Sequence, residues 1–171
     1  MDDGDRPASD ASAAGGATAN DDAGAAGVAD GRHVLVAYDG TPQSETALAH
    51  ACRHHPDARM TVLHAIDPVA AGYSAEVSLP SVAEDWYESE RARARSLLED
   101  ASETAREYAV EVETTVEVGR PPAAVVEYAE EHHVDHVVLG SHGRTGLSRV
   151  LVGSVAEAVV RRSSVPVTVV R

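Results

Sequence analysis

Short apolar runs and amphipathic helical segments alternate along most of this chain, and this alternation constrains the fold more than any other feature. Each run holds enough valine, leucine and isoleucine for a strand, and the segments between them place apolar residues at helical spacing. Strands that alternate with helices favour a parallel sheet covered by helices on both faces. The expected strands are His33–Tyr38, Arg59–Ile66, Val110–Val118, His136–Leu139 and Val165–Val170.

Four helices are expected between these strands. The first begins at Thr41-Pro42, which is typical of a helix N-cap followed by proline at the first helical position. After a long loop at 67–83, a second and longer helix covers residues 84–108. The third helix follows Gly119, and the fourth covers residues 153–163. The sequence therefore predicts an α/β protein with five parallel strands.

The composition of each strand indicates its place in the sheet. The first and fourth strands are almost continuously apolar, as expected for strands buried on both faces. The third alternates valine with glutamate and the fifth contains Pro166, so both are expected at edges. The predicted order is 3-2-1-4-5, a Rossmann-like arrangement with its switch point between strands one and four. Ligands of such sheets bind there, outside the strand carboxyl ends, where Asp39–Thr41 and Gly140–Ser154 are expected to meet.

The first 30 residues differ in composition from the rest. They contain seven aspartates, a single base (Arg6) and almost no large apolar side chain. Such a segment cannot offset the entropy of ordering, so we expect a disordered acidic tail at 1–30 and one folded domain at 31–171. The whole chain has 28 acids and 14 bases, a net charge of −14. This excess argues against binding to nucleic acid or anionic membranes and is typical of halophilic proteins, in which negative charge maintains solubility.

The scarcity of two residue types excludes several chemistries. All 14 bases are arginine, so the chain lacks the lysine of a Schiff base or of a Walker A phosphate loop. Cys52 is the single cysteine, which excludes an intramolecular disulfide and a zinc cage, and its place on an apolar helix face predicts a core residue. No apolar run approaches the roughly 18 residues of a membrane span. We therefore expect a cytoplasmic protein.

The segment Gly140–Ser154 has three features of a phosphate site. Its glycines at 140, 143 and 153 permit positive φ and a close approach of backbone amides to a ligand. Gly153-Ser154 opens a helix, whose free amides attract anions. Residues 136–156 contain no acidic side chain but include Arg144 and Arg149. The alternative is an ordinary glycine-rich loop in which Ser154 caps the helix.

Four motifs lie at the expected strand ends and in the glycine-rich segment: Tyr38-Asp39, Leu63-His64-Ala65-Ile66-Asp67, Gly119-x-Pro121 and Gly140-x2-Gly143-x9-Gly153-Ser154. Together they resemble the nucleotide-binding branch of the universal stress protein family, over residues 32–171. The resemblance implies a sheet of the adenine nucleotide alpha hydrolase type. It also implies ATP and Mg2+ as ligands at the switch point, and a homodimer formed by pairing of the last strands.

The same resemblance implies a role for each matching residue at the switch point. Asp39 would contact the ribose or a Mg2+ ion held by the phosphates. Ala37 and Ala65 would line the adenine pocket through their backbone groups. The ribose and phosphates would be held by Gly140, Ser141, Gly143, Arg144, Gly153, Ser154 and Val155.

The sequence shows no combination of nucleophile, base and orienting group that would define a catalytic site. The function implied is therefore that of a cytoplasmic regulatory protein of the stress response, a homodimer that binds ATP and acts on a protein partner. Two alternatives stay open. One is a slow metal-dependent ATPase that uses Asp39 through Mg2+. The other is an interaction module that binds no nucleotide and acts through its acidic tail or its dimer surface.

A second group of polar residues, His132, His133, Asp135 and His136, has the composition of a metal site. These residues span a helix end and a strand start, so their side chains are expected to diverge. His132 and His136 are four residues apart but are not expected on one helix face, where a histidine pair at i and i+4 binds zinc in several enzymes. We therefore expect surface and helix-capping histidines here rather than a metal centre.

Overall fold

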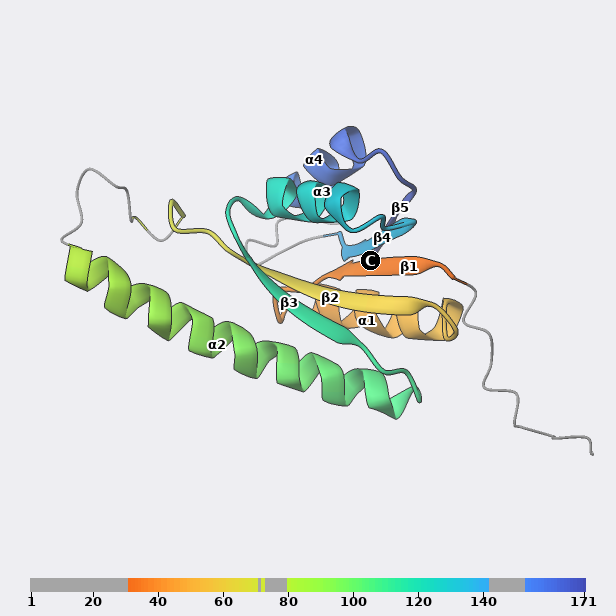
Figure 1. The fold of residues 1–171 in the computed structure, drawn as a ribbon. Helices are drawn as coiled ribbons and strands as arrows, with labels where there is room; N and C mark the ends of the chain where they lie inside the picture. The colour runs from red at the N-terminus through yellow and green to blue at the C-terminus, as the bar shows by residue number, and fades with distance from the viewer. Residues whose placement is uncertain (1–30, 71, 73–79, 142–152) are drawn as a thin grey trace, which may run out of the picture.

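The computed structural model describes residues 31–70, 72, 80–141 and 153–171, and these form one parallel sheet with helices on both faces (Figure 1). The sheet has five strands in the order β3-β2-β1-β4-β5. This confirms the predicted fold class and the predicted strand order. The elements in chain order are β1 (His33–Ala37), α1 (Pro42–His54), β2 (Arg59–Ile66), α2 (Pro80–Glu107), β3 (Glu113–Val118), α3 (Pro121–Glu131), β4 (His136–Gly140), α4 (Ser154–Arg162) and β5 (Val167–Val170).

Each face of the sheet carries its own apolar core. Because side chains alternate along a strand, Val34 and Val36 of β1 face α1 and α2, whereas Leu35 faces α3 and α4. Figure 1 shows these helix pairs on opposite sides of the sheet. Cys52 is 1% exposed within the first core, as predicted. The largest fully buried side chains on the two faces are Leu35, Leu48, Met60, Leu63, Val34, Val36, Val62, Val125, Val137, Val138 and Val159.

Three elements start two or more residues away from the sequence prediction. The long helix begins at Pro80 rather than near residue 84, because proline is compatible with the first turn of a helix. β3 begins at Glu113 rather than Val110, because the Val110 amide donates to the Ala105 carbonyl in the turn that ends α2. β5 begins at Val167, just after Pro166. Val118, at the end of β3, is 51% exposed.

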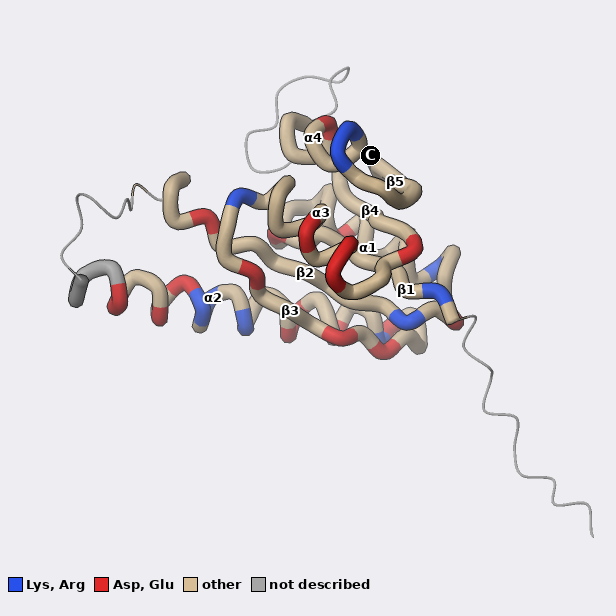
Figure 2. Tube along the Cα trace, turned by 45° about the horizontal axis from the view of Figure 1, so that its top comes forward, with Lys and Arg blue, Asp and Glu red and all other residues tan. Residues whose placement is uncertain are grey.

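Acidic residues occur along α2, α3 and β3 (Figure 2). Arg59 of β2 makes a bidentate ion pair with Glu113 of β3, with Nη2 2.8 Å from Oε2. On α2, Arg93 lies 3.9 Å from Glu90 one turn earlier. Both pairs are exposed, so each contributes little to folding stability. In the part of the chain that the structure describes, no helix combines the length and hydropathy needed to cross a bilayer.

Candidate functional site

A pocket opens at the predicted switch point, where the carboxyl ends of β1, β2 and β4 meet the amino ends of α1, α3 and α4. Its open space, including the part that is continuous with solvent, is about 580 Å3. One side is apolar and the rim beside α1 is polar. The lining residues are Ala37, Tyr38, Asp39, Thr41, Ser44, Leu63, His64, Ala65, Pro121, Val125, Leu139, Gly140 and Val155.

Asp39 is held at the rim by the start of α1. Its Oδ1 accepts hydrogen bonds from the Thr41 amide at 3.1 Å and from the Thr41 hydroxyl at 2.6 Å. Thr41 is the N-cap of α1, and its Oγ1 also accepts from the Ser44 amide at 3.3 Å. The half-buried carboxylate is therefore fixed in orientation by residues that the helix start itself positions.

Gly140 lets β4 pass close to the first turn of α1. A Cβ at this position would lie 2.8 Å from the carbonyl carbon of Gln43 and 2.9 Å from its oxygen. The sequence prediction assigned this glycine to positive φ or to approach of a ligand. Gly140 is absent from the positive-φ residues among the described part of the chain, so what requires glycine here is contact with the α1 backbone.

The main chain of β2 continues past the end of β1 at this pocket. The Leu63 carbonyl faces β1, because it accepts from the Tyr38 amide at 2.8 Å. The Ile66 carbonyl faces β3, because it accepts from the Gly119 amide at 2.8 Å. Successive residues of an inner parallel strand bond to alternate neighbours, so the amide and carbonyl of Ala65 face the β1 side. β1 ends at Ala37, which pairs with Leu63, and the Ala65 groups therefore lie beside the pocket.

The start of α4 is tied to the end of β4. The amide of Gly153, the N-cap residue of α4, donates to the Ser141 carbonyl, and the Ser141 amide donates to Val170 of β5 at 2.7 Å. Gly153 has φ −59°, so it too is not required for positive φ. Ser154 is the first helical residue rather than the cap, and no side chain caps this helix. Its first amides are thus without intrahelical acceptors.

The predicted site residues divide into three groups. Ala37, Asp39, Ala65, Gly140 and Val155 line the pocket together. Ser141, Gly153 and Ser154 are not among the lining residues and lie at the junction of β4, β5 and α4, where Ser141 is 2% exposed. Gly143 and Arg144 lie outside the described residues, so their placement in the site stays a prediction.

Several lining residues were missed by the prediction of the site. Leu63, Val125 and Leu139 were assigned to strands and a helix face, and the sequence contains no signal that separates pocket wall from core. Thr41 was predicted as a helix cap but not as a partner of Asp39. His64 lies within a family motif, yet its contact with the Tyr38 carbonyl (2.8 Å from Nδ1) depends on the strand register.

Tyr38 is the buried phenol of the pocket. Burial raises its pKa above 10.0, and the negative charges of Glu45, Asp100 and Asp39 raise it further. The phenol is therefore neutral at physiological pH and does not act as a base.

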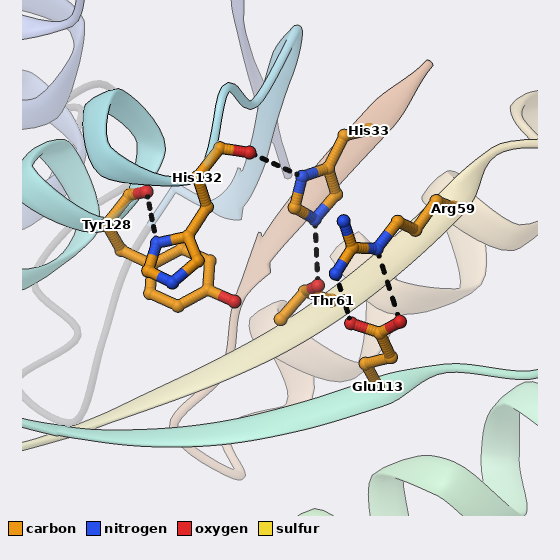
Figure 3. Close-up of polar contacts among 6 residues, drawn as sticks. All are labelled: His33, Arg59, Thr61, Glu113, Tyr128 and His132. Atoms are coloured by element: carbon orange, nitrogen blue, oxygen red, sulfur yellow. Dashed lines mark hydrogen bonds and ion pairs between the residues drawn. The ribbon is translucent and has the colours of Figure 1, made fainter. Parts of the chain in front are cut away.

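The histidines considered as metal ligands lie between the end of α3 and the start of β4, at the end of the sheet opposite the pocket. Figure 3 shows one of them, His132, beside His33. His132 is the C-cap of α3; its ring stacks on Tyr128 with centroids 3.8 Å apart, and its Nδ1 donates to the Tyr128 carbonyl. His33 lies between the His132 carbonyl (3.2 Å) and the Thr61 hydroxyl (2.8 Å). Within the described ranges, no three histidine, cysteine or acidic side chains are grouped to hold a metal ion.

A parallel sheet of order 3-2-1-4-5 with a pocket at its switch point defines an α/β protein of the ligand-binding, Rossmann-like class. A family model described as "Universal stress protein family" matches residues 31–171. The chain belongs to the universal stress protein family.

Individual relatives agree with this assignment. Universal stress protein MJ0531 of Methanocaldococcus jannaschii is 32% identical over 143 residues, which cover 82% of each chain. The structure of UspA from Lactobacillus plantarum superposes with a TM-score of 0.71 at 27% identity, over 82% of this chain and 97% of that one. A universal stress protein in complex with cAMP has a TM-score of 0.56 at 25% identity, over 82% of this chain and 96% of that one.

Proposed function

We propose that this chain binds ATP, with Mg2+ on the phosphates, in the switch-point pocket, and that it acts as a regulatory homodimer. The main support for the proposal is that the main-chain amide and carbonyl of Ala65 lie beside an apolar pocket. An amide donor and a carbonyl acceptor on one residue match the N1 acceptor and the N6 donor of adenine. Hydrogen bonds to this edge of the base identify it.

The walls of the pocket suit a flat aromatic base. Ala37, Leu63, Val125, Leu139 and Val155 present aliphatic surface from five different elements, which is the lining expected of a nucleobase site. A relative at 25% identity was solved with cAMP, and adenine is the part of that ligand that ATP shares. This relative supports the adenine class of ligand for the present pocket.

The phosphates would extend toward α4. The amides at the start of this helix and its dipole favour anions, and the predicted contacts of Gly143, Arg144, Gly153 and Ser154 belong to this part of the site. The glycine-rich segment that precedes α4 contains two arginines and no acid, so its charge suits a triphosphate.

The residues present fit a Mg2+ ion that arrives with the nucleotide. Mg2+ in such sites is held by one or two carboxylates together with substrate phosphates and water. Asp39 supplies one carboxylate at the rim of the pocket, and its Oδ1 is already engaged with Thr41. Oδ2 is the oxygen that would face the ion. A carboxylate fixed by two hydrogen bonds is suited to orienting a ligand, which favours binding over the alternative of ATP hydrolysis.

The homodimer would form through β5. This strand is an edge of the sheet, and its four residues are all half-buried in the single chain. Val160 of the neighbouring α4 is 51% exposed. An edge strand of this composition can pair with a second copy. The regulatory role, the cytoplasmic location and the protein partner remain predictions from the sequence.

The proposal is tested by identifying what the protein carries. The full chain is purified without added nucleotide and denatured, and the supernatant is examined by mass spectrometry. We expect an adenine nucleotide, together with calorimetric binding of ATP to protein stripped of ligand. If no nucleotide is released and ATP does not bind, the proposal is wrong and the nucleotide-free interaction module becomes the better account.

A further inference from the structure

The hydrogen-bond ladder between β1 and β2 stops one bond short of where the register of the two strands would let it continue. In a continued parallel ladder, the Tyr38 carbonyl would be the acceptor for the Ala65 amide, because the Tyr38 amide already donates to Leu63. Instead, the Tyr38 carbonyl accepts from the His64 imidazole, whose Nδ1 lies 2.8 Å away. Among the described residues beyond the end of β1, the Tyr38 amide bonds to Leu63, but no bond joins the Ala65 amide to the Tyr38 carbonyl.

His64 therefore occupies the acceptor that would otherwise take the Ala65 amide. A carbonyl accepts only from a donor, so Nδ1 carries a proton in this contact. The half-buried imidazole belongs to the same strand as Ala65, and both residues line the pocket. The His64 side chain thus ends the β1–β2 hydrogen-bond ladder at the point where the pocket begins.

We propose that His64 is a positioning residue for base recognition: by binding the Tyr38 carbonyl, it keeps the Ala65 amide available to the adenine edge. This inference rests on the proposed function, because it assigns the origin of base selectivity in that same pocket. Adenine presents an acceptor at N1 and a donor at N6, whereas guanine presents a donor at N1 and an acceptor at O6. The Ala65 amide and carbonyl, held in fixed positions, can therefore pair with both groups of adenine. With guanine the same donor and acceptor would stay unpaired, which is costly in a buried site.

The proposal predicts a loss of selectivity when the His64 donor is removed. In His64→Ala, the Tyr38 carbonyl is released and becomes the partner of the Ala65 amide. We expect affinity for ATP to fall about tenfold, the value of roughly one hydrogen bond, and the preference for ATP over GTP to fall with it. His64→Asn places a donor Nδ2 where Nδ1 was, so it should restore both quantities to within about threefold.

Two measurements on the full chain test this. Calorimetric titration with ATP and with GTP gives affinity and selectivity, and amide hydrogen exchange by NMR follows the Ala65 N–H without any ligand. This amide should exchange fast in the wild type and slowly in His64→Ala. The matched control is His136→Ala, which removes a half-buried strand histidine at the other end of the sheet, where its Nε2 contacts Thr168 at 2.8 Å. The control should leave selectivity and Ala65 exchange unchanged.

The outcomes separate this inference from the proposed function. If the wild type binds ATP and His64→Ala binds it with the same affinity and selectivity, the role of His64 is wrong and the ATP site stands. Slow exchange of the Ala65 amide in the ligand-free wild type would also overturn it. If the wild type binds neither nucleotide, the proposed function fails, and the role of His64 in base recognition fails with it.

Discussion

Gly140 is packed so closely against α1 that the structure leaves no room for a side chain there. Replacing it with alanine would place a Cβ 2.8–2.9 Å from backbone atoms of Gln43, and a backbone cannot move aside as a flexible side chain can. We expect Gly140→Ala to lower the free energy of unfolding by about 1–3 kcal/mol, the usual cost of overpacking, and to weaken ATP binding because α1 must shift. Urea denaturation measures the stability. Wild-type stability in this variant would contradict the packing role.

Asp39 offers a test of the metal within the proposed site. Asp39→Asn keeps an oxygen that accepts from Thr41 but removes the charge that would face Mg2+. We expect its affinity for ATP to fall about tenfold with Mg2+ present and much less in EDTA. Titration calorimetry in the two buffers decides the matter. An equal loss in both would indicate a ribose contact instead.

At the scale of single residues, the sequence predicted the position of Asp39 and Gly140 at the pocket, but it gave a different reason for the glycine. Asp39 was expected at the strand end because an Asp-Gly pair follows an apolar run, and it lies at the pocket rim. Gly140 was assigned to ligand approach, whereas its environment shows contact with α1. Which atoms lie next to a glycine depends on how the helix packs against the strand, and a local sequence pattern does not indicate this packing. His64 was passed over for the same reason.

The order of the strands could be predicted because the composition of each strand indicates whether one or both of its faces are buried. The apolar β1 and β4 lie inside the sheet, and the valine–glutamate alternation of β3 indicates an edge. Element ends were less accurate. Val110 continues the valine pattern of β3 but belongs to the turn after α2, where Ala109 has φ +58°. Backbone capping of that helix outweighs the strand periodicity.

The edge strand β5 allows a test of the proposed homodimer. The Pro166 carbonyl accepts from Val137 of β4 and the Val170 carbonyl accepts from Ser141, just after β4. The amide of Val169 therefore faces away from β4. Val169→Pro removes this outward donor and leaves the ladder to β4 in place, since proline is tolerated where the amide faces solvent. Light scattering should show about twice the 17.9 kDa chain mass for the wild type and a monomer for the variant. A monomeric wild type, or an unaffected dimer in the folded variant, would contradict pairing through β5.

At the scale of the whole molecule, several of the described histidines lie at the end of the sheet opposite the pocket, near the end of α1 and the start of β4. His55 lies against His136 with ring centroids 5.1 Å apart, and His50 stacks on His54 at 4.0 Å. Burial lowers the pKa of His50, His55 and His136 below 6.5, and neighbouring positive groups lower these pKa values further.

This arrangement predicts a loss of stability in acid. Above pH 6.5 these imidazoles are neutral in both states, so they do not disfavour folding. As the pH falls below 6.5, the unfolded chain binds protons first, and the free energy of unfolding decreases until the pH passes the lower pKa values of the folded protein. Thermal melting from about pH 7.5 to 5.5 should show this decline, and His136→Gln should reduce its slope. A melting temperature that rises in acid would contradict the sign.

The location of the pocket could be predicted from the sequence, but the side chains that line it could not. Its location follows from the strand order, because the switch point lies between β1 and β4. Its walls come from three strands and three helices, and which side chains line it depends on the angles at which these elements pack. Apolar residues such as Val125 carry the same sequence signal in a pocket as in a core.

The central claim is that adenine nucleotide binds at this switch point, and an NMR titration of the full chain with ATP and Mg2+ tests it most directly. Amide signals of the lining residues should shift with saturation, while His33, Thr61 and Asp135 at the far end of the sheet should not. If the signals of the lining residues stay fixed, or if the shifts gather elsewhere, the claim is wrong. The residues predicted to respond are Ala37, Asp39, Ala65, Gly140 and Val155.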